Sequence, residues 1–408
     1  MNTNKNLITI LGGGLQGVSV ALALANRGYS CEIIEQKPRL LAAASYGNEG
    51  KIHLGLVYAL DKTLKTGQKM LQGAYSFAPL LDKWCAPLPW AKWRSKGFLY
   101  GVMPDSLSSA EELRFYYEQL KQAKCNIRDE LPVTPSYIGF EPRWFWKDSF
   151  ITPMPDTKIA VPTTFIETEE VAVDTILLTK QIEKIVNAIS KISVRCNSYI
   201  ERCEKISDGF RIYVKEHDNS LTIDSNIVVN CTWNDRYRID QHVGFQEQTD
   251  NFSYRVKYRV IVQPRINLAN EHPVTMVQGP YGDMTPYRNG LVYLSWYPLC
   301  RTYFNSKPPS EEIYCHDGLR SIAHNTLARF EELFPMLDGA IIKSCTPCTI
   351  VARGDTDVDD PESSLHRRDD TGPIGGNGWW SVNTGKLTTA PLYGEMAASK
   401  LSEEIESS

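Results

Sequence analysis

The fold is decided near the N-terminus by residues 7–35, which read LITILGGGLQGVSVALALANRGYSCEIIE. The apolar run 7–11 predicts a buried parallel strand, and residues 15–27 have helical character that Gly28 ends. Residues 30–35 predict a second strand. Strand, helix and strand together make a β-α-β unit of the expected size. This segment therefore predicts the start of a parallel sheet.

The turn between the first strand and the helix carries the pattern Gly12-x-Gly14-x-x-Gly17. Gly12 permits a tight turn, Gly14 lets the backbone approach a pyrophosphate, and Gly17 lets helix and strand pack closely. The helix N-terminus offers N–H groups and a positive dipole end to phosphates. Glu35 follows the second strand, where a carboxylate can accept hydrogen bonds from ribose hydroxyls. The pattern predicts a dinucleotide site, and the alternative is a glycine turn that binds no ligand.

Composition is that of an ordinary globular protein. Of the 408 residues, 42% are hydrophobic and 23% are charged, and the net charge of -4 gives no field that would attract nucleic acid. No apolar stretch approaches the roughly 18 residues that cross a bilayer, and residues 1–6 do not begin a signal peptide. The ten cysteines have no disulfide framework, which suits a reducing compartment and predicts a cytoplasmic protein. Disorder is expected only in the tail, near residues 402–408.

Three further segments carry recognisable patterns. Residues 44–58 read ASYGNEGKIHLGLVY, residues 228–233 read VVNCTW, and residues 381–391 read SVNTGKLTTAP. With the glycine turn, they resemble the D-amino acid oxidase and glycerol-3-phosphate dehydrogenase superfamily of FAD-dependent oxidoreductases over nearly the whole chain. The segment at 228–233 departs from the family's V-V-N-A-A-G-x-W strand because it lacks the glycine.

The resemblance implies that the cofactor is FAD. In relatives the closing segment faces the pyrimidine side of the isoalloxazine ring, where N–H groups, Lys386 or a helix dipole would stabilise the anionic reduced flavin. The residues that it implies at the cofactor are Gly12, Gly14, Leu15, Gln16, Gly17, Glu35, Gln36, Lys37, Ser45, Asn48, Gly50, Lys51, Ile52, His53, Asn230, Cys231, Thr232, Gly385, Lys386, Leu387 and Thr388.

The resemblance also implies the fold, an α/β protein (α+β overall) with a Rossmann-like FAD-binding domain and a discontinuous antiparallel-sheet substrate domain. We expect the FAD-binding domain to comprise residues 1–60, 165–250 and 340–408. The substrate-binding or cap domain is then expected to comprise residues 61–164 and 251–339.

Candidate substrate residues come first from a predicted strand of the second sheet. Arg255, Lys257 and Arg259 alternate with apolar or aromatic residues, so the three cations share one face. They either line an anion-binding pocket, with Lys257 close to the chemistry, or form a solvated face. In relatives this strand roofs the substrate cavity. Tyr293, Trp296 and Tyr297 are expected as aromatic walls, although strand aromatics are more often part of the core.

Two further residues are candidates for catalysis. His53 has the pKa range of a base that takes a proton from a hydroxyl or amine, and its alternative role is only to contact the flavin. Arg353 resembles the arginine that binds the substrate carboxylate in amino-acid-oxidising relatives. Its alternative is an ion pair with Asp355 or Asp357.

No metal is expected. Asp355-x-Asp357-x-Asp359 resembles a calcium loop, but it lacks Gly at the sixth position and Glu at the twelfth, so it is expected to be a solvated acidic loop. Cys345 lies in a segment comparable to one that holds the flavin covalently in some sarcosine oxidases. Covalent and non-covalent binding both stay open.

The expected function is that of an FAD-dependent oxidase or dehydrogenase of the D-amino acid oxidase type. It would remove a hydride from a C–H next to N or O of a small polar metabolite such as an amino acid, hydroxy acid or amino sugar. The patterns Ala-Ser-Tyr-x-Asn at 44–48 and Gly-Lys-x-Thr-Thr-Ala-Pro at 385–391 resemble a branch of this superfamily that is often encoded beside polysaccharide or natural-product genes. The resemblance suggests natural-product or polysaccharide biosynthesis as the context. The electron acceptor would be oxygen, or a quinone or other carrier. The alternatives are an NAD(P)H-dependent flavin monooxygenase or reductase and a non-enzymatic flavin-binding protein.

Overall fold

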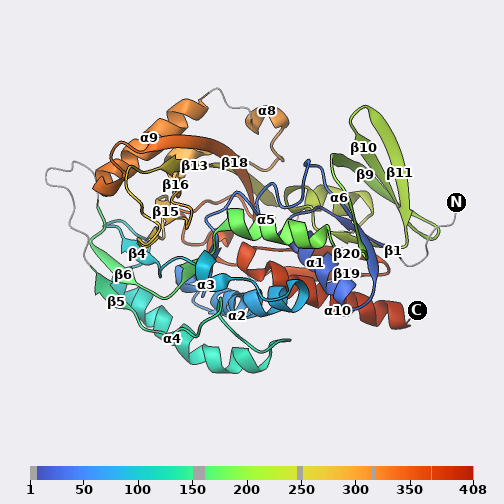
Figure 1. The fold of residues 1–408 in the computed structure, drawn as a ribbon, viewed down its shortest axis with the longest axis horizontal. Helices are drawn as coiled ribbons and strands as arrows, with labels where there is room; N and C mark the ends of the chain where they lie inside the picture. Colours follow the sequence, from blue (N-terminus) through green and yellow to red (C-terminus); the bar gives the residue numbers. More distant parts are fainter. Residues whose placement is uncertain (1–6, 150–160, 246–250, 315–317, 369, 408) are drawn as a thin grey trace.

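Two large sheets with helices packed against them form most of the described part of the molecule (Figure 1). The first contains β1 (Leu7–Leu11) and lies on the right of that view, and the second contains β13 (Phe252–Gln263) and lies on the left, with α9 (Leu319–Leu333) over it. The computed structural model describes residues 7–149, 161–245, 251–314, 318–368 and 370–407.

The first sheet has the order β19-β20-β12-β1-β2-β8 in the described part of the chain. Every pairing is parallel except that of β19 with β20. Four of the five residues of β1 are buried, because the strand is covered on both faces. The predicted β-α-β unit and the α/β class are thus confirmed. The other strands are β2 (Ser30–Ile34), β8 (Ile192–Arg195), β12 (Ile227–Asn230), β19 (Gly372–Gly376) and β20 (Trp379–Asn383).

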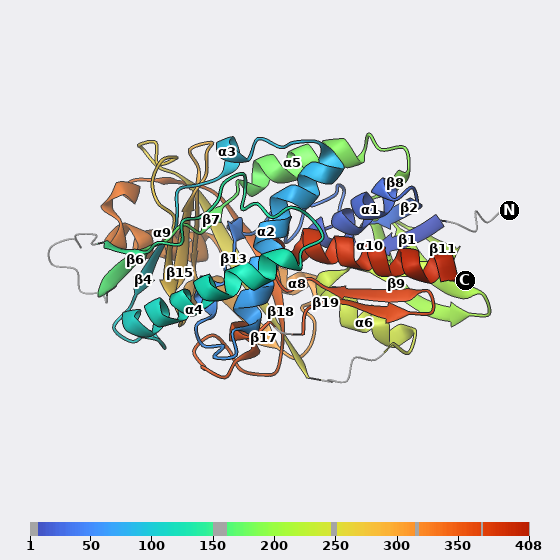
Figure 2. The ribbon, with the colours of Figure 1, turned by 90° about the horizontal axis from the view of Figure 1, so that it is seen from below.

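Helices from distant parts of the chain cover this sheet. α1 (Leu15–Asn26) and α10 (Ala390–Ser407) run side by side, and α2 (Lys65–Cys85) crosses them, as Figure 2 shows. A Cβ on Gly394 of α10 would stand 2.6 Å from the Cβ of Ser19 on α1, so the two helices approach closely. The expected disorder of the tail is wrong for residues 402–407, which continue α10.

The second sheet is mostly antiparallel. β13 pairs with β18 (Ile341–Arg353) along its whole length, and among the described strands of this sheet only β4 and β14 pair in parallel. Apolar residues of α9, including Leu327 and Phe330, pack with Val260 and Leu294 in one core. The other strands are β4 (Leu99–Val102), β5 (Lys147–Ser149), β6 (Thr164–Glu167), β14 (Val274–Val277), β15 (Gly282–Pro286), β16 (Val292–Trp296) and β17 (Arg301–Asn305).

The remaining elements are short or peripheral. Residues 201–206, 210–215 and 221–223 predict a small antiparallel meander with turns at Asp208-Gly209 and Asp218-Asn219. It is present as β9 (Ser198–Ile206), β10 (Gly209–Glu216) and β11 (Asn219–Ser225). β3 (Lys51–Ile52) pairs with β7 (Val171–Ala172). The α-helices are α3 (Trp90–Trp93), α4 (Ala110–Asp129), α5 (Thr175–Val186), α6 (Arg236–His242), α7 (Tyr297–Cys300) and α8 (Glu311–Tyr314). The 3-10 turns are η1 (Leu56–Tyr58), η2 (Trp233–Asp235), η3 (Pro335–Leu337), η4 (Ser364–His366) and η5 (Leu387–Thr389). Among the described residues, no helix has the length and apolarity that crossing a membrane requires.

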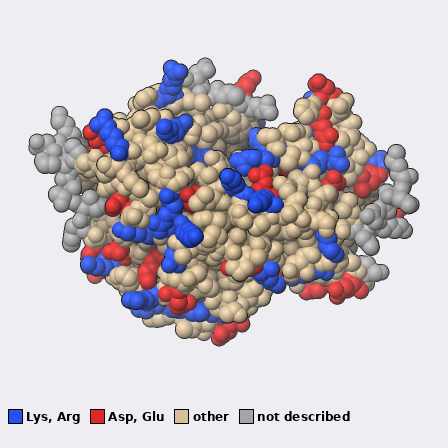
Figure 3. Space-filling view, viewed as in Figure 1, with Lys and Arg blue, Asp and Glu red and all other residues tan. Residues whose placement is uncertain are grey.

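The expected domain boundaries do not coincide with the boundaries of the packing. α2, expected in the cap, shares one core with β1 and α1. β18, expected in the FAD-binding part, is a strand of the second sheet. We therefore propose that the FAD-binding part includes α2 and resumes after Arg353 instead of at residue 340. Positive and negative side chains are interspersed over the visible face (Figure 3), so that face carries no field of a single sign.

Candidate active site

The glycine turn leaves the N-terminus of α1 free for an anion. Gly12 has φ 95°, and a Cβ on Gly17 would stand 1.9 Å from Gly12 O, so both positions require glycine. Gly14 is the N-cap residue and provides no side-chain cap, and the first turn of α1 has no acidic residue. The Leu15 N–H donates to Ser45 Oγ at 2.8 Å. The uncapped N–H groups and the helix dipole suit a pyrophosphate.

Glu35 closes the other side of this turn. Its carboxylate accepts the Gly13 N–H at 2.6 Å and the Lys37 N–H at 2.7 Å. Burial raises the pKa of Glu35, and the backbone N–H groups only partly offset that effect. The position is the one that a ribose-binding carboxylate occupies in the dinucleotide fingerprint. Gln36 and the predicted Lys37 follow it on the surface.

The segment 45–53 turns back toward the sheet on its own hydrogen bonds. Asn48 Oδ1 accepts the Gly50 N–H at 2.7 Å, while Asn48 Nδ2 donates to the Ala44 carbonyl at 2.8 Å. β3 follows directly, and its two residues, Lys51 and Ile52, are buried. The polar residues of this segment therefore shape the turn that carries Lys51 and His53 inward.

Lys51 is a buried cation in a polar network. Its side chain is 3% exposed, its Nζ donates to Thr275 Oγ1 at 2.5 Å, and it lies 4.3 Å from the centre of the Phe98 ring. Asp283 on β15 lies 3.6 Å from Lys51 Nζ and 3.6 Å from Lys257 Nζ. Burial would raise the pKa of Asp283, but the two lysines outweigh it and the net pKa is lowered. No motif pointed to Asp283, because its role depends on two lysines that lie far away in sequence.

His53 is buried against a second carboxylate that the sequence analysis missed. Its Nδ1 lies 3.5 Å from Oε1 of Glu170, which is fully buried. Glu170 also accepts the Leu54 N–H at 2.6 Å and the hydroxyl of Tyr100. Burial lowers the pKa of His53, and Glu170 opposes that effect. For Glu170, burial acts to raise the pKa, but its hydrogen bonds and the charges of His53 and Lys51 give a net lowering. Glu170 is therefore an ionised partner of His53.

The strand end at 230–232 is held by its own side chains. Asn230 Nδ2 donates to Asp240 Oδ1 at 2.8 Å, and Asn230 Oδ1 accepts the Thr232 hydroxyl at 2.7 Å. A Cβ on Gly12 would stand 2.7 Å from the Cys231 carbonyl oxygen, so this strand end passes directly beside the glycine turn. The family's own glycine is missing from this segment, and its contact with FAD stays a prediction.

The C-terminal turn meets the 51–53 segment. The hydroxyl of Thr388 accepts the His53 N–H at 2.9 Å and donates to the Lys51 carbonyl at 3.3 Å. The neighbouring Lys386 has its pKa lowered to about 8, first by burial and then by Arg368. Gly385 and Leu387 flank it in the same turn. Hydrogen bonds thus join two segments that lie more than three hundred positions apart in the sequence.

A cavity of about 190 Å³ lies between this turn and the second sheet. Three of its lining residues carry positive charge (Lys257, Arg368 and Lys386), and Asp283 carries negative charge. Arg368 is 7% exposed, and its buried Nε has no partner among the described residues. The rest of the lining is Met276, Gly279, Tyr281, Gly282, Tyr297, Ile350, Val358 and Leu365.

Of the residues expected at the substrate, Lys257 and Tyr297 line this cavity. Arg255 and Arg259 are buried, which excludes a solvated face. Arg255 Nε donates to Asp357 at 2.8 Å, and the Arg259 guanidinium donates to the Tyr46 carbonyl and to Thr346 Oγ1, both at 2.8 Å. Their donors are thus occupied by the protein itself.

The other expected substrate residues lie elsewhere. Arg353 pairs with Asp370 at 3.3 Å, not with Asp355 or Asp357, and it lines a separate cavity of about 20 Å³. Tyr293 and Trp296 are buried in apolar clusters and are not among the lining residues. His53 does not line the cavity either. Burial raises the pKa of the Cys345 thiol to about 12.

The glycine turn, the parallel sheet and the adjoining cavity define a two-part dinucleotide-binding enzyme with a site between its sheets. A family model described as FAD dependent oxidoreductase, DAO, matches residues 8–400. The chain belongs to this family, and it is an FAD-dependent oxidoreductase of the D-amino acid oxidase-like type.

Solved structures have the same fold. Glycine oxidase from Geobacillus kaustophilus matches with a TM-score of 0.65 at 15% identity, over 98% of this chain and 94% of that one. L-amino acid deaminase from Proteus myxofaciens matches with a TM-score of 0.64 at 12% identity, over 99% of this chain and 91% of that one. Glycerol-3-phosphate dehydrogenase from Bacillus halodurans, solved with FAD, matches with a TM-score of 0.57 at 13% identity, over 100% and 66%. No curated protein matches the sequence.

The residues in place fit FAD. The uncapped start of α1 would hold the pyrophosphate and Glu35 a ribose, while the turn at 385–388 adjoins both the 51–53 segment and the cavity. The expected cofactor and fold class are therefore confirmed, and the individual contacts to FAD stay predictions.

Proposed function

We propose that the protein oxidises an anionic metabolite, such as a carboxylated amino acid or hydroxy acid, at a C–H next to N or O. The observation that supports this most is the charge of the cavity: three cations (Lys257, Arg368 and Lys386) stand against one carboxylate, which two lysines already share. A cavity with surplus positive charge favours an anion. FAD, when bound, supplies the acceptor for the hydride.

The chain's own residues would bind and orient the substrate. Arg368 presents a planar fork of donors, one of which has no partner, and such a fork suits a carboxylate. Lys257 and Lys386 would add charge on the other sides, with Lys257 also neutralised in part by Asp283. His53 does not line the cavity, so we propose for it the alternative role, a buried contact to the flavin that Glu170 holds in place.

We also propose an electron acceptor, a cellular compartment and a biosynthetic context for the reaction. The electron acceptor would be oxygen, or a quinone or other carrier. The cytoplasm suits the cysteines, because those in the described part of the chain are all unpaired. A role in natural-product or polysaccharide biosynthesis remains a proposal.

Anaerobic flavin bleaching tests the proposed function. Amino acids, hydroxy acids and amino sugars are added to the purified holoenzyme without oxygen, and loss of the oxidised flavin band is followed. We expect bleaching by anionic substrates and none by their uncharged amides or esters. A protein that cannot be loaded with flavin, or one that bleaches with NADPH alone, would contradict the proposal.

Substitution of Arg368 should weaken substrate binding more than substitution of Arg353. Arg368→Leu removes a cavity cation with charge-assisted hydrogen bonds of about 1.5–3 kcal/mol, so half-saturation should shift by roughly 10- to 100-fold. Arg353→Leu is the matched control, because Arg353 lies outside this cavity. The measurement is the substrate concentration that gives half-maximal bleaching rate. A larger effect from Arg353→Leu would restore the original assignment of the carboxylate to Arg353.

Anion binding should depend on pH through Lys386. Burial lowers the pKa of Lys386 to about 8, so its ammonium is present below that pH and is lost as the pH rises through it. We therefore expect anion affinity to fall above about pH 8 and the fall to be smaller in Lys386→Met. Lys343→Met, which removes an exposed lysine on β18, is the control. Spectral titration with acetate at several pH values measures the effect, and identical profiles for wild type and Lys386→Met would refute it.

A further inference from the structure

One side of the cavity is made by a single loop, residues 354–368, which we call the wall loop. It follows β18 and contributes Val358, Leu365 and Arg368 to the lining. The loop is closed on itself: the Ser364 hydroxyl donates to the Arg353 carbonyl, and His366 Nε2 lies 3.1 Å from the Val358 carbonyl oxygen. Compact loops of this length that are packed by their own side chains are frequently functional.

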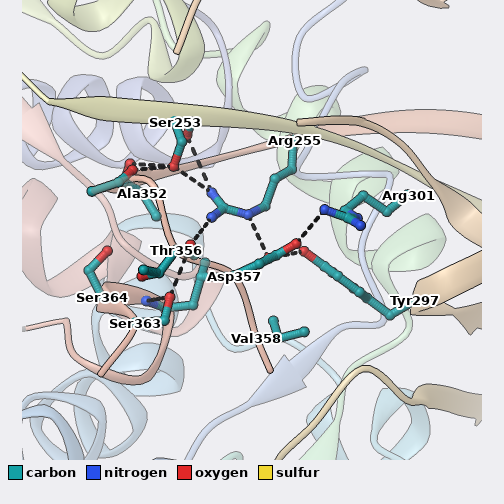
Figure 4. Close-up of polar contacts among 12 residues, drawn as sticks. Ser253, Arg255, Tyr297, Arg301, Ala352, Thr356, Asp357, Val358, Ser363 and Ser364 are labelled. Atoms are coloured by element: carbon teal, nitrogen blue, oxygen red, sulfur yellow. Dashed lines mark hydrogen bonds and ion pairs between the residues drawn. The ribbon is translucent and has the colours of Figure 1, made fainter. Parts of the chain in front are cut away.

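Asp357 fastens the wall loop to the second sheet (Figure 4). Its Oδ1 accepts Arg255 Nε at 2.8 Å and the Tyr297 hydroxyl at 2.6 Å, and its Oδ2 accepts Arg301 Nη1 at 2.7 Å. The three donors come from β13, α7 and β17. We call Asp357 with its three donors the clasp.

Further hydrogen bonds hold Arg255, one of the three donors of the clasp, in place. Arg255 is fully buried, and it also donates to Ser253 Oγ at 3.0 Å and to the Thr356 carbonyl. Ser253 Oγ in turn donates to the Gly354 carbonyl at 2.5 Å. The two ionised partners and the phenol lower the pKa of Asp357, although its burial acts in the other direction. The expected solvated loop is therefore wrong at Asp357, which is an ionised, buried anchor.

The clasp is coupled to the cavity on both of its sides. Tyr297 lines the cavity, and its hydroxyl donates a hydrogen bond to Asp357. Val358, the residue after Asp357 in the wall loop, also lines the cavity. Arg368, at the far end of the loop, is fixed by its N–H to Thr66 Oγ1 at 2.9 Å and brings the guanidinium proposed for the carboxylate. A displacement of Asp357 therefore changes the width of the cavity and frees the Tyr297 phenol.

We propose that Asp357 is a positioning residue that sets which anions the cavity accepts, by holding the wall loop against Tyr297. The inference rests on the proposed function, because it concerns the same cavity. Tyr297 and Arg368 touch the ligand in this scheme, and Asp357 acts through them. With the clasp intact the cavity admits small anions; with the clasp open it also admits larger ones.

The test compares Asp357→Asn with Asp359→Asn, a control two residues away whose side chain is exposed. Acetate and phenylacetate, a small and a large carboxylate, are titrated into each holoenzyme and the flavin spectrum reports the dissociation constants. We expect wild type and Asp359→Asn to prefer acetate, and Asp357→Asn to shift the ratio of the two constants at least 10-fold toward phenylacetate. Cleavage by a glutamate-specific protease at the exposed Glu362 of the wall loop should accelerate only in Asp357→Asn.

Tyr297→Phe is a less disruptive variant that tests the inference if Asp357→Asn does not fold. Tyr297→Phe removes one hydrogen bond of the clasp and leaves both ion pairs. It should shift the same ratio about 3-fold without faster cleavage. The inference is overturned if a folded Asp357→Asn protein has the same ratio of the two dissociation constants as Asp359→Asn. If Asp357→Asn does not fold, the inference is overturned when Tyr297→Phe has the same ratio as Asp359→Asn. A wild type that binds neither carboxylate would instead contradict the proposed function.

Discussion

Gly17→Ala should yield a destabilised protein that is purified without flavin. A Cβ at this position would stand 1.9 Å from the Gly12 carbonyl oxygen and 3.2 Å from Ile10 Cγ2, so helix α1 must move away from β1. Overpacking of this kind should lower the free energy of unfolding by about 3 kcal/mol. The same movement pulls the helix N-terminus away from the pyrophosphate position. Urea denaturation measures the first effect, and the flavin absorbance of the purified protein measures the second.

Gly14→Ala is the matched control within the same turn. Gly14 has φ -70° and ψ 178°, and a Cβ there would meet only Ser45 Oγ, at 3.5 Å. Its stability without flavin should therefore stay within about 0.5 kcal/mol of wild type. FAD binding should still weaken, because the new methyl group occupies the place where the backbone approaches the pyrophosphate. Normal flavin affinity in Gly14→Ala would show that the cofactor lies elsewhere.

Glu170→Ala should be the most destabilising substitution behind the site. The carboxylate is fully buried, and its loss leaves the Leu54 N–H, the Tyr100 hydroxyl and His53 without their acceptor. Each buried donor left without its acceptor costs about 1–3 kcal/mol, so losing the acceptor of both the Leu54 N–H and the Tyr100 hydroxyl should cost about 2–6 kcal/mol. Chemical denaturation of the flavin-loaded protein measures the loss.

Two further variants separate the causes of that loss. Glu167→Ala removes a half-buried carboxylate at the end of β6, three residues away, and should change stability by less than about 0.5 kcal/mol. Glu170→Gln keeps an oxygen that can accept from Leu54 and should lose less than Glu170→Ala. Equal stability of Glu170→Ala and Glu167→Ala would mean that the hydrogen bonds accepted by Glu170 do not stabilise the folded protein.

Local sequence patterns predicted the architecture well, because strands and helices follow from periodicity within a few residues. β1, α1 and β2 lie where residues 7–35 predict them, and the meander at 198–225 follows its turn signals. The family resemblance added the cofactor. The polar residues at 402–407 were expected to be disordered, but they continue helix α10.

The substrate side was harder to predict, because the fate of a charge depends on partners that are distant in sequence. Arg255 was expected beside the ligand, but Asp357, 102 positions later, takes its donors. Asp283 and Glu170 were missed because they lie in no motif, and their importance comes from Lys51 and His53. Lys257 lies on the same strand face as Arg255 and Arg259, and it lines the cavity. The alternation of charged and apolar residues therefore predicted that the three cations share a face, but not which of them lines the cavity.

The hydroxyl of Thr388, which joins the His53 N–H to the Lys51 carbonyl, has a consequence for biosynthesis. The segment at 51–53 leaves the ribosome long before residue 388 is made. Synthesis at about 5–20 residues per second separates the two by many seconds. The proposed flavin contacts at 385–388 are therefore missing from the nascent N-terminal half until β20 has joined the sheet and α10 has packed beside α1. With FAD bound as proposed, we expect cofactor loading only after translation has passed this turn.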